Sequence, residues 1–212
     1  MPYSGRIKSL LLLALLAIAP VLGAQDDPAG AASSVRPSLI AQSCFSCHGK
    51  AGNSSDGAAP SIAGLPKGYI IAVMRAYRHG GRFSILMGRL ATAYTEAEVM
   101  ELADYFSRQS FSIHKQRVDW ELAHLGGQLH RLYCKGCHGD RWIPPERDIP
   151  TLNGRWISYL RWTLRDYLLG ISQSDEKMSE RLIQVIRRHG MQGIEALIHY
   201  YGSARPADSN QE

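Results

Sequence analysis

The chain has 212 residues, of which 45% are hydrophobic and 20% charged, with a formal net charge of +5 at neutral pH. This composition excludes an intrinsically disordered protein, and the length allows one large domain or two small ones. The basic residues form neither a stripe nor a run interleaved with aromatic residues, so the sequence lacks the electrostatic footprint of a nucleic-acid-binding protein.

The first residues have the layout of a secretory signal peptide. Arg6 and Lys8 form a short positive region, an apolar run follows from Leu10 to Ala19, and a small residue stands at Ala24. The apolar run is about half of the ~20 residues that span a bilayer, which favours cleavage after Ala24 over a retained anchor. We therefore predict that residues 1–24 are a signal peptide and that the mature protein is periplasmic, without stable membrane insertion.

All four cysteines of the chain fall in two short motifs with the pattern Cys-x-x-Cys-His, ninety positions apart. The motif residues are Cys44, Cys47 and His48 in the first and Cys134, Cys137 and His138 in the second. The pattern is typical of c-type haem attachment, in which two thiols one helical turn apart add to the haem vinyl groups and the histidine binds iron. We therefore predict two covalently bound haems c.

Other uses of the cysteines are a thioredoxin-like redox pair, a four-cysteine zinc site, or disulfides in an exported protein. A thioredoxin motif needs a βαβ setting, which the sequence pattern does not offer. A zinc ribbon would have to join two motifs that are a domain's length apart. The histidine after each cysteine pair favours haem over all three alternatives.

The two motifs belong to a longer unit that occurs twice. Pro60 and Gly64 recur as Pro150 and Gly154, again ninety positions later. The matches then continue through both copies: Tyr69 with Tyr159, Tyr77 with Tyr167, Gly80 with Gly170, Met87 with Met178, and Val99, Leu102, Tyr105 and Phe106 with Ile194, Leu197, Tyr200 and Tyr201. The offset grows to ninety-one at the methionines and ninety-five in the last group, so the second copy has an insertion before its last helix.

The apolar spacing predicts helices in both copies and no strand of useful length. Residues 69–78 and 159–169 have apolar residues three and four positions apart, and each segment is followed by glycine. A terminal helix begins near Thr95 with a capping-box spacing, and another helix spans residues 120–132, before the second motif.

These elements predict an all-α protein of two tandem class I cytochrome c domains. The first domain is placed at residues 25–113, the second at 114–205, and a polar tail at 206–212. The boundary lies in the segment 111–118, between the last helix of one copy and the first of the next.

Each proximal histidine leaves one axial position on the iron, for which methionine sulfur is a suitable ligand. Distance from the histidine does not separate Met87 and Met178 from the pair Met100 and Met191. The repeat does, because Met87 aligns with Met178, whereas Met191 aligns with Glu96. We therefore predict that Met87 and Met178 bind the two irons, from a loop that folds over each haem.

The carbonyls of Pro60 and Pro150, each twelve positions after its histidine, are the predicted acceptors of the second imidazole N–H, and a plain turn is the less favoured alternative. The other six histidines show no paired spacing and are interpreted as surface or packing residues.

The whole mature chain resembles the dihaem c-type cytochromes built from two class I cytochrome c domains. Within that group it is most similar to the cytochrome subunits of flavocytochrome c sulfide dehydrogenases. The resemblance is carried by the two haem motifs, each followed by glycine, and by residues 60–66, 85–89, 159–163, 177–178 and 194–197. It implies ligation by His48 and Met87 and by His138 and Met178, with electrons received from a flavoprotein subunit that oxidises sulfide.

Two other functions stay open at this point. Free dihaem carriers of the c-four type, which feed a terminal oxidase or reductase, share several of these patterns. A haem enzyme with an open iron would need a labile or cysteine-ligated haem, whereas here all cysteines serve attachment and each copy has a placed methionine. The sequence holds no flavin-binding motif, so a flavin would belong to another chain, and whether the chain is part of an enzyme is left open.

Overall fold

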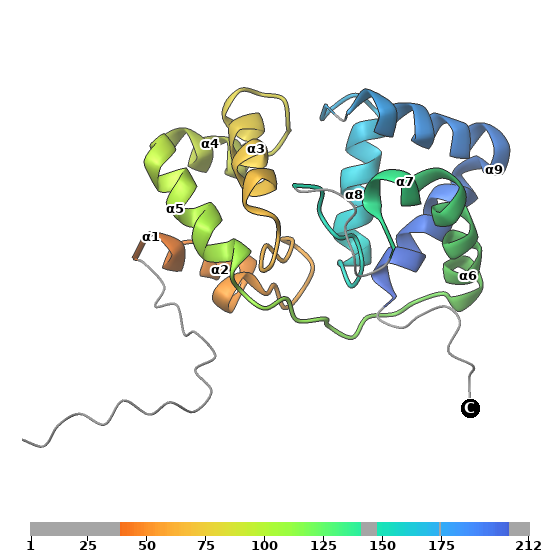
Figure 1. The fold of residues 1–212 in the computed structure, drawn as a ribbon, viewed down its shortest axis with the longest axis horizontal. Coiled ribbons are helices and arrows are strands. Elements are labelled where there is room, and N and C mark those ends of the chain that lie inside the picture. The colour runs from red at the N-terminus through yellow and green to blue at the C-terminus, as the bar shows by residue number, and fades with distance from the viewer. Residues whose placement is uncertain (1–38, 141–147, 174, 204–212) are drawn as a thin grey trace, which may run out of the picture. The chain divides into compact units, whose positions relative to one another are not determined.

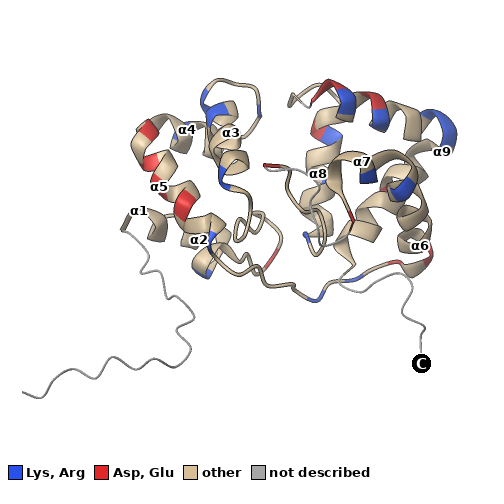
Figure 2. Cartoon of the chain, in the orientation of Figure 1, with Lys and Arg blue, Asp and Glu red and all other residues tan. Residues whose placement is uncertain are grey.

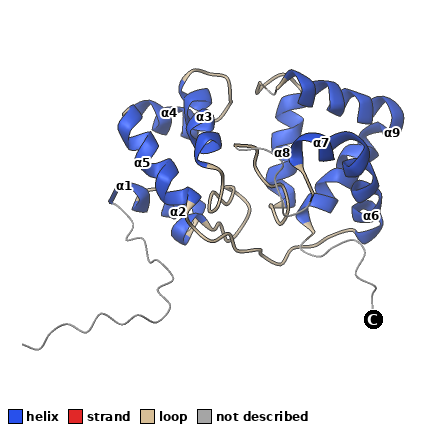
Figure 3. Cartoon of the chain, viewed as in Figure 1, coloured by secondary structure: helices blue, strands red, loops and turns tan. Residues whose placement is uncertain are grey.

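A computed structural model describes residues 39–140, 148–173 and 175–203. All of them belong to one compact unit, Val35–Glu212. The predicted signal peptide at residues 1–24 and the polar tail at 206–212 lie outside the described residues. The described part is helical and contains no strand, in agreement with the predicted all-α class (Figure 3).

The first copy of the repeat forms five α-helices and a short 3₁₀ turn (Figure 1). These elements are α1 (Leu39–Gln42), α2 (Phe45–His48), η1 (Lys50–Gly52), α3 (Lys67–Arg78), α4 (Ile85–Ala93) and α5 (Glu96–Ser107). The capping box at the start of α5 is confirmed: the Thr95 side chain accepts from the Glu98 backbone N–H, and the Glu98 carboxylate accepts from that of Thr95.

The second copy contains α6 (Trp120–Leu129), a π-helical turn η2 (His130–Cys134), α7 (Lys135–His138), α8 (Ile157–Leu168) and α9 (Glu176–Gly202). The helix predicted for residues 120–132 thus ends at Leu129 and changes its hydrogen-bond pattern before the cysteines. Helix α9 is kinked at Gly190, where φ is 63°.

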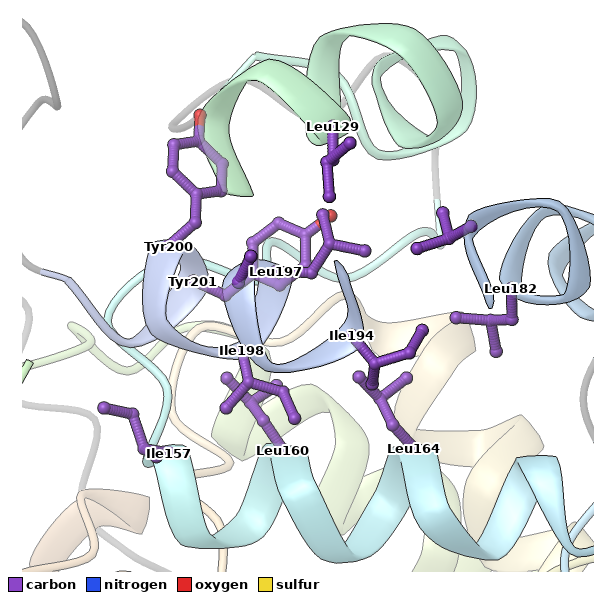
Figure 4. Packing of buried hydrophobic residues seen from close by; sticks show 12 residues of the cluster. Leu129, Ile157, Leu160, Leu164, Leu182, Ile194, Leu197, Ile198, Tyr200 and Tyr201 are labelled. Atoms are coloured by element: carbon purple, nitrogen blue, oxygen red, sulfur yellow. The ribbon is translucent and has the colours of Figure 1, made fainter. Parts of the chain in front are cut away.

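Each copy has its own hydrophobic core. The first core gathers residues from Ala41 to Phe106, and the second gathers residues from Leu129 to Tyr201. In the second, Leu160 and Leu164 of α8 lie against the last part of α9 (Figure 4). The repeat-matched residues of the two terminal helices are all buried, and full burial of one such side chain contributes about 1.5–3 kcal/mol.

The predicted domain boundary at residues 113 and 114 falls between the two cores and stays a prediction. Across residues 39–203, leaving the undescribed gaps aside, no helix has both the length and the hydrophobicity needed to cross a bilayer.

Candidate haem centres

The first motif occupies a single helical turn. Cys44 immediately precedes α2, and the His48 backbone N–H donates to its carbonyl at 2.9 Å. Residues three apart on a helix lie on the same side, so the side chains of Cys44 and Cys47 share one face. Cys47 is exposed and Cys44 half-buried, which leaves both thiols accessible to a planar group lying against this turn.

A hydrogen bond at Nδ1 orients the His48 ring and leaves its other nitrogen, Nε2, for metal binding. The ring is buried, and Nδ1 lies 2.8 Å from the carbonyl oxygen of Pro60, so the contact expected from the twelve-residue spacing is confirmed. Because a carbonyl only accepts, Nδ1 carries the proton and Nε2 keeps the lone pair that a metal requires. Burial lowers the pKa of His48 and so favours the neutral imidazole, whereas the hydrogen bond to the Pro60 carbonyl has a smaller, opposite effect on this pKa.

The second motif repeats this arrangement with looser geometry. Cys134 precedes α7, Cys137 lies within it, and the two are half-buried and exposed respectively. Nδ1 of His138 lies 3.5 Å from the Pro150 carbonyl, at the outer limit of a hydrogen bond. Burial is again the main effect that lowers the pKa of this histidine.

The candidate axial methionines lie in first turns of helices and not in the loops that we predicted. Met87 is the third residue of α4 and Met178 the third of α9, and each is half-buried against the core of its own copy. A helix fixes such a side chain more firmly than a loop, because its backbone is already hydrogen-bonded. Ser84, the N-cap residue of α4, bonds to Met87 itself: the Met87 backbone N–H donates to Ser84 Oγ at 3.1 Å.

The other methionines have different surroundings. Met74 is a buried core residue of α3, whereas Met100 and Met191 are 48% and 57% exposed. These positions agree with their interpretation as core and surface residues.

One histidine that the sequence did not single out lies close to the second motif. His130 is 3% exposed; its Nε2 lies 2.8 Å from the Gly139 carbonyl and its Nδ1 3.0 Å from the Tyr201 hydroxyl. Tyr201 also hydrogen-bonds the side chain of Cys134. The repeat offered a signal, because His130 stands where the first copy has the apolar residue Ile40.

A buried arginine joins the two loops that orient the proximal histidines. Arg155 donates from Nη1 to the Ser61 carbonyl at 2.8 Å and from Nε to the Thr151 carbonyl at 3.2 Å. Ser61 and Thr151 follow the prolines that accept from the two histidines, and they are equivalent residues of the repeat. Burial lowers the pKa of Arg155 to about 10, so the group stays charged at neutral pH.

The donor set of each copy fits haem c. Two thiols lie on one helical face, an imidazole is oriented through Nδ1 with Nε2 left for iron, and a half-buried thioether lies in the same copy. Haem c supplies a one-electron iron couple when it is bound. The protein's own contribution is to fix the histidine ring through a backbone carbonyl and to surround the site with an apolar core.

An all-α chain with two such centres is a dihaem c-type electron-transfer cytochrome. The comparisons with known proteins agree with this class. The chain is 39% identical over 79 residues to the "Cytochrome subunit of sulfide dehydrogenase" of Chlorobaculum tepidum, covering 37% of this chain and 71% of the relative. It is 28% identical over 178 residues to cytochrome c4 of Pseudomonas aeruginosa, covering 80% and 83% of the two chains.

Among solved structures, the crystal structure of reduced recombinant cytochrome c4 from Pseudomonas stutzeri is similar with a TM-score of 0.65 and 25% identity. That match covers 76% of this chain and 92% of the other. No family model matches the chain. The chain belongs to the class I cytochromes c in their dihaem form, with two covalently bound haems.

Proposed function

We propose that this cytochrome is the haem subunit of a sulfide-oxidising flavocytochrome and accepts electrons from a flavoprotein subunit. The similarity to the cytochrome subunit of a sulfide dehydrogenase carries the proposal. Oxidation of hydrosulfide to the level of elemental sulfur releases two electrons and one proton. Two one-electron haems match those two electrons, and the flavin of the partner is the group that can take a pair and pass on single electrons.

Within each centre, the proposed iron ligands are His48 with Met87 and His138 with Met178. Cys44 and Cys47, and likewise Cys134 and Cys137, are the proposed thioether residues. The proposal also includes a periplasmic location after removal of residues 1–24. The mass of the secreted protein tests the thioether bonds and the removal of residues 1–24. It should equal the chain from residue 25 plus two haems, and the protein should have no titratable thiol.

A group of exposed apolar side chains supports docking of the partner at the first haem. Phe83, Ile85, Leu86 and Leu90 are 57%, 70%, 56% and 40% exposed, and all lie on α4 or just before it, around Met87. Stable subunit interfaces bury apolar surface of this kind.

The charges on the first copy also favour a permanent subunit over a steered carrier. Figure 2 shows acidic residues along α5. Glu96 pairs with Arg75 and Arg78, and Asp104 pairs with Lys67 and Arg108. These pairs join two of the four acidic residues of α5 to four basic ones, which weakens the long-range field that this face offers to a basic partner.

The alternative is a free dihaem carrier that serves a terminal oxidase or reductase. The observation in its favour is coverage: the similarity to cytochrome c4 spans 80% of this chain, whereas the similarity to the sulfide dehydrogenase subunit spans 37%.

Haem reduction by sulfide in the presence and absence of a flavoprotein distinguishes the flavocytochrome subunit from the free carrier. The purified cytochrome is mixed with sulfide, with and without a co-expressed flavoprotein of the sulfide dehydrogenase type. Rapid haem reduction only with the flavoprotein, in a complex that survives high salt, supports the subunit. A monomeric cytochrome that binds no flavoprotein and turns over with a terminal oxidase favours the free carrier.

An interface variant sharpens the test. Ile85→Asp should weaken the complex at least tenfold, because it places a charge in the exposed apolar group. Leu169→Asp is the matched control, since Leu169 is 60% exposed but lies at the end of α8 in the second copy. Equal effects of the two variants would argue against docking through α4.

A further inference from the structure

A single buried arginine contacts equivalent residues of both copies. Arg82, 8% exposed, donates to the hydroxyls of Tyr159 at 2.7 Å and Tyr69 at 3.4 Å. Its guanidinium carbon also lies 5.5 Å from the ring centre of Tyr77 and 5.9 Å from that of Tyr167. Two tyrosines from each half therefore surround one positive charge.

The repeat makes the tyrosines symmetric and the arginine unique. Tyr69 is equivalent to Tyr159, and Tyr77 to Tyr167, at the offset of ninety. The same offset places Ser172 at the position of Arg82. The two copies thus supply equivalent pairs of tyrosines, and the one arginine contacts both pairs.

The backbone on both sides of Arg82 is bonded to the other copy. The Gln173 backbone N–H donates to the Gly81 carbonyl at 2.8 Å, and the Phe83 backbone N–H donates to Ser172 Oγ at 3.0 Å. These two bonds join the loop that precedes α4 to the loop that precedes α9. Arg82 is therefore fixed in place by its backbone as well as by its side chain.

The joined loops lead directly to the proposed axial ligands. Met87 lies in the first turn of α4, five residues after Arg82, and Tyr69 and Tyr77 pack against the same core as Met87. In the second copy, Tyr167 and Met178 pack against one core. Three of the four tyrosines in contact with Arg82 thus pack against the cores against which the two methionines also pack.

In the described part of the chain the polar partners of the Arg82 side chain are tyrosine hydroxyls, and none of the ion pairs found there includes Arg82. The carboxylate of Asp166 acts on the same surroundings: burial is the main effect that raises the pKa of Tyr77 and Tyr167, and Asp166 adds to it. A buried cation acts over a longer range than a surface charge, because little water screens it. Ferric iron carries one more positive charge than ferrous iron. A nearby fixed cation therefore favours the reduced state.

We propose that Arg82 is a redox-tuning residue shared by the two haem centres, whose single buried charge raises the reduction potentials of both. Arg82 acts through space on both irons and does not bind either. The inference rests on the proposed positions of Met87 and Met178 as axial ligands. It goes beyond the proposed function because it holds for either electron partner.

Spectroelectrochemical titration of the complete dihaem protein tests the proposal. Arg82→Gln should lower the equilibrium constant for reduction of both haems at least tenfold, which corresponds to about 59 mV for a one-electron couple. Arg82→Lys retains the charge and should stay within about threefold of the wild type. Arg82→Met is a second charge-free variant of similar length, for use if glutamine prevents folding.

Exposed arginines provide matched controls. Arg75→Gln and Arg161→Gln each remove one positive charge that is paired with a glutamate on the surface, one in each copy. Neither should change either potential more than about threefold, because solvent screens both sites.

The sulfur-to-iron charge-transfer absorption of the oxidised protein separates this inference from the ligand assignment. If the absorption persists in a folded charge-free variant and both potentials fall, the proposal holds. If it persists and only one potential, or neither, falls, the proposal is overturned. Loss of the absorption in Met87→His or Met178→His bears on ligation alone.

Discussion

The two copies of the repeat make the turn before their last helix in different ways. In the first copy, α4 ends at Ala93 and a new helix begins after Thr95, whose side chain caps it. In the second copy, two helical segments of α9 meet directly at Gly190, whose backbone is not helical, with φ of 63° and ψ of −167°. At the offset of ninety-five, Gly190 stands at the position of Thr95. A side-chain cap and a glycine with positive φ are two solutions to one change of direction.

The surroundings of the two haem-binding motifs also differ between the copies. The contact from Nδ1 to the proline carbonyl is 2.8 Å for His48 and 3.5 Å for His138. The second copy also places His130 and Tyr201 beside its motif, where the first copy has apolar residues. A stronger Nδ1 hydrogen bond makes an imidazole a better donor to ferric iron. We therefore expect the first haem to have the lower potential, which makes electron flow from the first haem to the second favourable.

The largest change should come from replacing the proposed axial ligands. Met87→His and Met178→His should each lower one potential, since a basic nitrogen replaces a soft sulfur. Each should also remove about half of the sulfur-to-iron charge-transfer absorption. Redox titration of the two variants assigns the potentials, and Met87→His should act on the lower one.

Met100→Ala and Met191→Ala are the controls, because both residues are largely exposed. Neither should reduce the charge-transfer absorption. If Met100→Ala abolishes it in one copy, the ligand assignment is wrong.

The next largest effect is expected where α6 and α9 approach most closely. A Cβ added at Gly126 would overlap the carbonyl of Ala196. Gly126→Ala should therefore destabilise the second copy by about 2–3 kcal/mol, through backbone displacement. Denaturant unfolding followed by haem absorption measures it. Gly88→Ala, with its nearest neighbour at 3.8 Å, should be neutral or slightly stabilising.

The sequence predicted the repeat, the main helices and the proximal contacts because each depends on short spacings or on residues that recur. It did not predict that the helical segments that hold Met178 and Tyr201 meet directly at Gly190 without a longer loop, because a glycine signals a helix end but not the length of the connection. His130 and Arg82 each have one hydrogen-bond partner more than seventy positions away, Tyr201 and Tyr159 respectively. Such contacts depend on how helices pack, which periodicity within a single element does not encode.

The hydrogen-bonded pair His130 and Tyr201, beside the second motif, should contribute less to the free energy of unfolding than the close approach at Gly126. His130→Leu removes the hydrogen bond to the Gly139 carbonyl and should cost about 2 kcal/mol of unfolding free energy. In a cycle with Tyr201→Phe, the coupling should be about 1 kcal/mol. Only the second haem's potential should change in these variants. A shift confined to the first haem would contradict the position assigned to this group.

The bend in α9 allows a smaller test. Gly190 has φ of 63° and no atom within 4 Å of an added Cβ, so the cost of Gly190→Ala is purely conformational. We expect a loss of about 1–2 kcal/mol in denaturant unfolding. Gly136→Ala is the matched control, because that site is equally open but does not have a positive φ. Equal stability of the two variants would show that the bend is not strained by a side chain.

The smallest effect should follow from removing the cap of α5. Thr95→Ala eliminates the side-chain acceptor for the Glu98 backbone N–H, which should cost about 1 kcal/mol. Thr95→Ser keeps the hydroxyl and should restore most of that loss. Because α5 carries core residues of the first copy, the change should appear in the unfolding of the first haem's surroundings and leave those of the second unaltered. If both copies lose stability equally, the two halves unfold as one cooperative unit, and the differences between their turns do not act locally.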